Sequence, residues 1–167
     1  MKIANLTTLL GISFVVSIGV FGLSISGYLH PPPQLHPVVG TLTATLKVVT
    51  LPGKGGGIRH QLEMSSPLGA HTAIIRNFES HKPGIQAAVK QLTVGSAVTM
   101  SFATADFFTS PCHVWEIETP QAEVLSMYES LNVERVKNFR AAVFSGVLAV
   151  VFALWGWLIF LRYGRDK

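Results

Sequence analysis

The chain begins with a continuous apolar run and then changes to strict alternation of apolar and polar positions. The run extends from Ile3 to Leu29, and about 20 such residues are enough for a helix to cross the hydrocarbon layer of a membrane. Alternation follows from Val38 to Leu51, which predicts a half-buried β-strand. Its apolar face holds Leu42, Ala44, Leu46 and Val48.

Four further segments continue the alternating pattern, and one segment between them has helical spacing. The glycine-rich residues 52–57 separate the first strand from a second, which forms a hairpin with it. A third strand is expected over about 70–78, a fourth around "AVTMSF" (97–102) and a fifth at "CHVWEIET" (112–119). A short helix is expected between the third and fourth strands, because Pro83 is followed at helical spacing by Ile85, Ala88, Val89 and Leu92.

This order of elements is the order of an OB-fold, a small five-stranded barrel with a helix between its third and fourth strands. The stretch "LTVGSAVTMSF" (92–102) looks like the glycine turn that enters the fourth strand of such barrels. A second uncharged stretch, Ala141–Leu161, is long enough to span a membrane. The expected fold is therefore a membrane-anchored α+β protein, in which two transmembrane helices flank an OB-like β-barrel with one short helix.

The expected organisation has six segments. They are an N-terminal transmembrane helix (1–29), a proline-rich linker (30–37), an extracytoplasmic β-rich domain (38–123), a juxtamembrane helix (124–140), a C-terminal transmembrane helix (141–161) and a basic tail (162–167). Small residues at Ser24 and Ser26 leave open a second interpretation of the first segment, a cleaved signal peptide.

Charge supports the membrane assignment and gives an orientation. Only 13% of the residues are charged, against about 25% in an ordinary soluble domain. The ends carry Lys2, Arg162, Arg165 and Lys167, and cationic flanks stay in the cytoplasm. Both termini are thus predicted to be cytoplasmic and residues 30–140 extracytoplasmic, with the spans in the inner (plasma) membrane.

This layout resembles that of uncharacterised bacterial two-pass membrane proteins that display a small β-rich domain between their spans. The resemblance covers nearly the whole chain and is one of arrangement. It implies a location in the cell envelope, and it brings no catalytic residues with it.

The single cysteine, Cys112, is followed by His113. Neighbouring side chains of a strand point to opposite faces, so this pair is a poor chelate or nucleophile. Cys112 is expected to lie on one face with Val114 and Glu116, and His113 on the other with Trp115 and Ile117. The favoured interpretation is structural, with no metal and no cofactor. The alternative is a metal- or haem-handling module that uses Cys112 with His60, His71, His81 or His113.

Binding is predicted instead of catalysis, because no carboxylate pair has a spacing suited to acid–base chemistry. The loop residues Asp106, Phe107 and Phe108 are the candidate partner contact. Between residues 30 and 140 there are nine Lys or Arg and eight Asp or Glu, a net charge of +1. This balance, with the extracytoplasmic location, predicts no nucleic-acid partner.

The second span carries small residues on one helix face, which favour close helix packing with the first span, with other copies or with a partner. They are Ala142, Gly146, Ala149, Ala153 and Gly156. The sequence therefore predicts a non-enzymatic membrane protein that binds another protein, as an accessory subunit of an envelope complex or an inhibitor or immunity-type protein. A small oligomeric channel is a further alternative, although neither span holds an ionisable residue.

Overall fold

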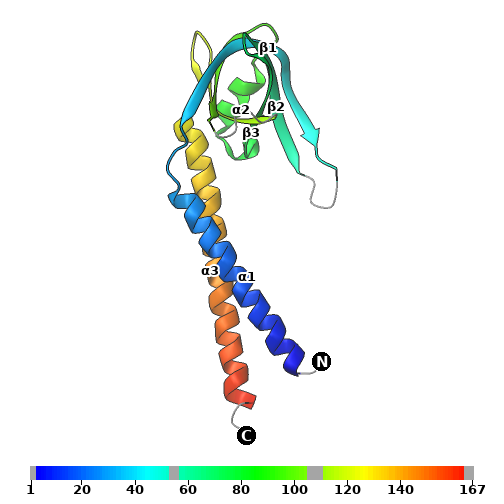
Figure 1. The fold of residues 1–167 in the computed structure, drawn as a ribbon, viewed down its shortest axis with the longest axis vertical. Coiled ribbons are helices and arrows are strands. Elements are labelled where there is room, and N and C mark those ends of the chain that lie inside the picture. Colours follow the sequence, from blue (N-terminus) through cyan, green and yellow to red (C-terminus); the bar gives the residue numbers. More distant parts are fainter. Residues whose placement is uncertain (1–2, 53–56, 105–110, 164–167) are drawn as a thin grey trace. The chain divides into compact units, whose positions relative to one another are not determined.

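The computed structural model describes residues 3–52, 57–104 and 111–163 (Figure 1). The chain forms two compact units, one from Pro31–Val133 and the other from Met1–His30 with Glu134–Lys167. In chain order the elements are α1 (Ile3–Leu29), β1 (Leu35–Thr50), β2 (Ile58–Ser66), β3 (Gly69–Ile75), the 3₁₀ turn η1 (Phe78–Ser80), α2 (Pro83–Lys90), β4 (Ala97–Ala103), β5 (Cys112–Glu118), β6 (Glu123–Leu125) and α3 (Met127–Tyr163).

The strands of the first unit close into an OB-like barrel, as the sequence predicts. Their order is β3-β2-β1-β4-β5, and a parallel pairing of β3 with β5 closes the circle. The long strand β1 pairs with β4 through its first half and with β2 through its second half. The short strand β6, which the sequence pattern did not indicate, extends the sheet beyond β5.

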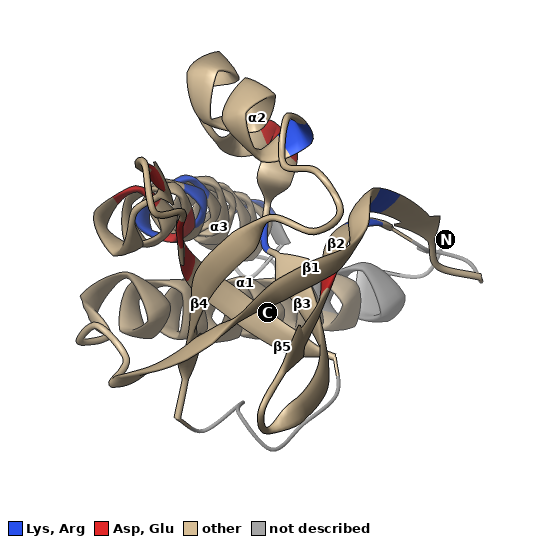
Figure 2. Cartoon of the chain, turned by 90° about the horizontal axis from the view of Figure 1, so that it is seen from above, with Lys and Arg blue, Asp and Glu red and all other residues tan. Residues whose placement is uncertain are grey.

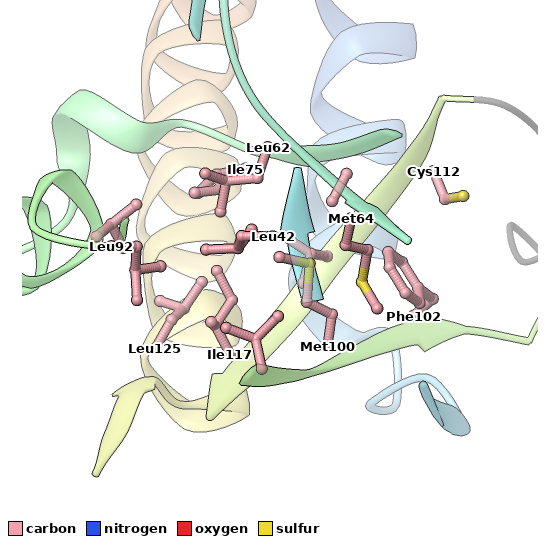
Figure 3. Packing of buried hydrophobic residues seen from close by; sticks show 14 of the residues in the cluster. Leu42, Leu62, Met64, Ile75, Leu92, Met100, Phe102, Cys112, Ile117 and Leu125 are labelled. Atoms are coloured by element: carbon pink, nitrogen blue, oxygen red, sulfur yellow. The ribbon is translucent and has the colours of Figure 1, made fainter. Parts of the chain in front are cut away.

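Alternating apolar positions on the strands fill the barrel (Figure 3). The predicted inward residues of β4, Val98, Met100 and Phe102, are all at most 2% exposed. Leu62 and Met64 of β2 are completely buried. The helix α2 contributes Val89, Leu92 follows it, and both pack into the same cluster. The period-two pattern thus places these strands correctly.

Three element boundaries differ from the sequence prediction. β1 begins at Leu35, inside the segment expected to be linker, because its pairing with β4 continues back to Leu35 opposite Ala103. β3 ends at Ile75, because Asn77 adopts a left-handed conformation with φ of 49° and η1 follows. Residues 124 and 125 belong to β6 and not to the juxtamembrane helix, which begins at Met127 and is continuous with the second span in α3.

A β-bulge changes the faces of β5. Ser101 of β4 pairs with Glu116, but the next residue, Phe102, pairs with Val114, so one residue of β5 is extra. A bulge shifts the alternation by one position. Ile117 is therefore buried in the core, and Glu116 lies outside, where it accepts a hydrogen bond from Ser101 Oγ. The prediction that Glu116 shares the face of Cys112 is wrong for this reason.

The helices α1 and α3 each contain a segment that is long and apolar enough to cross a membrane. These segments are Thr8–Leu29 and Met127–Arg162. Buried serines in them, Ser17 and Ser145, donate hydrogen bonds to backbone carbonyls one helical turn earlier. Hydroxyls in an apolar helix are satisfied in this way without a partner helix.

The predicted stripe of small residues on α3 is only partly covered. Ala142 is 1% exposed, and a Cβ added at Gly146 would lie 3.3 Å from the Phe21 ring of α1. Ala149 is half-buried, whereas Ala153 is exposed and a Cβ added at Gly156 would meet nothing within 4 Å. Among these residues, the structure brings α1 close to the part of α3 around Ala142 and Gly146.

Substituting leucine for Gly146 is expected to weaken the α1–α3 contact, because the larger side chain would displace Phe21. Cysteines introduced at Tyr28 and Phe139, whose rings are 5.8 Å apart, would report the contact by oxidative crosslinking. We expect the crosslink yield to fall by at least about half, because inserting a larger side chain into a packed contact costs about 1–3 kcal/mol. Gly156→Leu is the matched control and should crosslink like the wild type, and equal effects of the two substitutions would contradict the packing.

Candidate partner-binding site

The second half of β1 and the start of β2 form a two-stranded extension, here called the hairpin arm (residues 47–50 and 58–60). Figure 1 shows the arm continuing past the closed barrel. Its register pairs Val48 with His60, Val49 with Arg59 and Thr50 with Ile58. The pairing of β1 with β4 ends at Thr41 opposite Ala97. Within the described residues, the arm portion of β1 therefore has β2 as its only neighbouring strand.

One face of the arm is apolar and exposed. Val48 and Ile58 occupy alternate positions of the ladder, so their side chains lie on the same face as that of His60. Val48 is 60% exposed and Ile58 is 64% exposed. The sequence pattern placed Val48 on the apolar face of a half-buried strand, but the pairing of β1 with β4 ends before it and the side chain is exposed.

At the barrel end of this face lies a buried histidine, His60. The side chain of His60 is 7% exposed, and its Nε2 lies 3.1 Å from the carboxylate of Glu79. Its ring packs on Phe78 with centroids 4.5 Å apart. The Glu79 side chain is 72% exposed. His60 therefore lies at the boundary between the barrel core and the hairpin arm, and its carboxylate partner is Glu79.

The opposite face of the arm carries charged residues, and Figure 2 marks Lys and Arg positions in blue on the ribbon near β1 and β2. Lys47 Nζ lies 2.8 Å from Glu63 Oε1 across the two strands. Arg59, opposite Val49, is exposed. The arm therefore has an apolar face and an opposite face with an ion pair and an exposed arginine, a residue type that is enriched at protein-binding surfaces.

An arginine held in a fixed position lies next to the arm. Arg76 follows the pair formed by Ile75 and His60, and its side chain points away from the core. Its Nη2 lies 2.9 Å from His113 Nδ1, and its guanidinium carbon lies 5.9 Å from the centroid of the Trp115 ring. Two contacts that restrain an exposed arginine reduce the side-chain entropy lost when a partner binds. No sequence pattern indicated this cluster, because the parallel pairing of β3 and β5 brings it together.

The cysteine lies in the core and not at a site. Cys112 is 2% exposed and packs in the cluster that contains Met64 and Phe102 (Figure 3). His113 points to the other side, toward Arg76. Burial among apolar groups does not favour the thiolate form that metal binding and nucleophilic attack require.

The other two histidines of the alternative metal site, His71 and His81, contact different groups. His71 lies 3.0 Å from Ser66 Oγ, and His81 lies 3.2 Å from the carbonyl oxygen of Arg76. Over residues 3–52, 57–104 and 111–163, no group of three or more His, Cys, Asp or Glu is arranged to hold a metal ion. The predicted contact loop, Asp106 to Phe108, lies outside the described residues.

Comparison with known proteins identifies no family. No family model matches the sequence, and no curated protein matches it. Among solved structures, the chain is similar to Rim1, a mitochondrial single-stranded DNA binding protein of S. cerevisiae, with 13% identity over 53% of this chain and 96% of that one, at a TM-score of 0.39. It is also similar to TiaS in a complex with a tRNA and ATP, with 12% identity, 52% coverage of this chain and a TM-score of 0.37.

These similarities correct one prediction and support no assignment. The exclusion of nucleic-acid partners is contradicted, because the similar structures include a single-stranded DNA binding protein and a tRNA complex. This chain spans only 18% of the TiaS chain in that complex. At such low scores the likeness does not say what this chain binds. The class that its own pairing defines is an OB-like barrel joined to two apolar helices.

Proposed function

We propose that the chain is a two-span membrane protein that displays its OB-like domain on the extracytoplasmic side and binds another protein through the hairpin arm. In this role it is a non-catalytic accessory subunit or inhibitor of a complex in the bacterial envelope. Support for the anchors comes from the two long apolar helices and the basic residues at the chain ends.

The observation that carries the proposal is the exposed pair Val48 and Ile58 on the arm. Two large apolar side chains, each at least 60% exposed, extend from a strand pair that the barrel does not cover. Neither side chain contributes to the barrel core. An apolar patch is suited to a protein partner that covers the valine and isoleucine. A partner that also reaches the opposite face can offer carboxylates to the outward-pointing Arg59 and Arg76.

Site-specific photocrosslinking in cells tests this proposal. A photoreactive amino acid at Val48 should give a discrete protein adduct, and the same amino acid at Val94 should not. Val94 is a matched control, because it is also a valine and is also 60% exposed. Equal adduct patterns at the two positions would contradict the proposal, as would an adduct at Val48 that nuclease treatment removes.

With the photoreactive amino acid at Ile58, Val48→Asp is expected to lower the yield of the adduct at least tenfold, a change of about 1.4 kcal/mol in binding. The carboxylate would have to lose its hydration in an apolar contact. The free energy of unfolding should change by no more than about 0.5 kcal/mol, because the position is exposed. The measurement is adduct yield from a photoreactive group at Ile58, with Val94→Asp as the control. A yield that Val48→Asp leaves unchanged would contradict a role for the arm.

A further inference from the structure

His81 is a buried histidine that the proposed partner site does not use. It lies between η1 and α2, and only 4% of the residue is exposed. Its Nε2 lies 3.2 Å from the carbonyl oxygen of Arg76. Because a carbonyl oxygen only accepts, Nε2 carries the hydrogen. The other ring nitrogen, Nδ1, is buried and has no hydrogen-bond partner among the described residues, so the ring is accommodated in its neutral form.

The charged groups around His81 come from each element that packs there. From α3, Glu129 is 6% exposed and lies close enough to influence the charge of His81. Lys82, at the start of α2, lies with its Nζ 3.1 Å from Glu129 Oε2. From η1, Glu79 pairs with His60. The guanidinium of Arg76 is directed to His113.

The groups around His81 connect the start of α2 with the first turn of α3. Gln86 of α2 donates a hydrogen bond to the backbone carbonyl of His81 at 2.8 Å. In α3, the backbone N–H of Glu129 is capped by Ser126 Oγ at 3.2 Å. The Lys82–Glu129 ion pair links the two helices beside the imidazole. We call these residues, His81, Lys82, Gln86, Ser126 and Glu129, the α2–α3 junction.

Protonation does not suit this geometry. A cationic imidazole carries a hydrogen on Nδ1, which would become a buried donor with no acceptor in place among the described residues. The Glu129 carboxylate pairs with Lys82 through Oε2, and it makes no hydrogen bond with His81 Nδ1. Burial lowers the pKa of His81 below its usual 6.5, and it outweighs the opposing effects of the Arg76 carbonyl and Glu129. The stabilisation that comes from the neutral ring is therefore present above about pH 6.5 and is lost as the pH falls below it.

We propose that the α2–α3 junction is pH-sensitive, and that protonation of His81 loosens the first turn of α3 from α2. The proposal is independent of the partner that the hairpin arm binds. Its consequence is that acid acts first on the end of α3 that lies in the barrel unit, because the buried histidine and its ion-pair neighbours lie there.

Hydrogen exchange of the full-length protein in detergent tests the proposal. Peptides that cover 82–90 and 126–133 would be compared at pH 7.5 and 5.5, after correction for the intrinsic pH dependence of exchange. The wild type should open more at pH 5.5, by up to about tenfold, which is the limit for one proton bound on opening. Peptides from β4 should change less. An unchanged opening at the junction in the wild type would overturn the proposal.

The matched variants are His81→Gln and His71→Gln. Glutamine can donate to the Arg76 carbonyl and does not titrate, so His81→Gln should remove the pH response while His71→Gln keeps it. A response that persists in His81→Gln would also overturn the proposal. If His81→Gln does not fold, NMR of the imidazole resonances of His81 in the wild type tests the proposal instead. Titration of His81 below pH 6.5 together with amide changes in 126–133 supports the proposal. Titration at or above pH 6.5 overturns it.

Discussion

Replacing Phe102 by alanine is expected to lower the free energy of unfolding of the barrel by about 3–5 kcal/mol. Phe102 is completely buried on β4, and its removal leaves a cavity in the core cluster that also contains Met64 and Cys112. A typical domain has only about 5–15 kcal/mol of stability. The variant should therefore be close to unfolding at ordinary temperature.

Urea unfolding followed by tryptophan fluorescence measures this effect. Trp155 and Trp157 would first be changed to phenylalanine, which leaves Trp115 of β5 as the only tryptophan. Leu68→Ala is the control, because Leu68 is 66% exposed and its loss should change stability by no more than about 0.5 kcal/mol. A loss for Phe102→Ala as small as that of the control would show that the core is elsewhere.

Gly40→Ala is expected to destabilise the barrel by about 1–3 kcal/mol, although it adds a single methyl group. A Cβ at this position of β1 would meet the backbone oxygen of Ser65 and the Met64 methyl at less than 3 Å. The backbone of β2 must then move, and the pairing that bends β1 around the barrel is disturbed.

The control for Gly40→Ala is Gly84→Ala. A Cβ at Gly84, in the first turn of α2, would meet nothing within 4 Å, and alanine is a better helix former by about 0.5–1 kcal/mol. The two alanine variants should thus change the urea midpoint in opposite directions. Equal midpoints for Gly40→Ala and the wild type would contradict the tight approach of β1 to β2.

Alternation of residue types was enough to predict the barrel, because it is a local property. The buried residues Leu62 and Met64 of β2 and Met100 of β4 are at positions that the pattern assigned to the core. The antiparallel pairing of β1 with β2 was also predicted correctly. The helix between the third and fourth strands also agrees, and its Pro83 lies in the first turn.

Features that depend on long-range pairing were not predictable in this way. The exposure of Val48 depends on where β4 stops pairing with β1, and the face of Ile117 depends on a one-residue bulge opposite β4. The Arg76–His113 contact joins residues 37 positions apart through a parallel strand pair. A sequence pattern records the period of each strand but not the length or offset of its neighbours.

Two membrane spans that place the barrel on the opposite side from both chain ends are the basis of the proposed role. Single cysteines at Leu68 and at Lys2, in a Cys112→Ser background, would be labelled in intact cells with a membrane-impermeant maleimide. Leu68→Cys should react in intact cells once the outer layers of the envelope have been made permeable to the maleimide. Lys2→Cys should react only after the inner membrane is opened. Labelling of Lys2→Cys in intact cells, or protection of Leu68→Cys until lysis, would contradict the two-span topology.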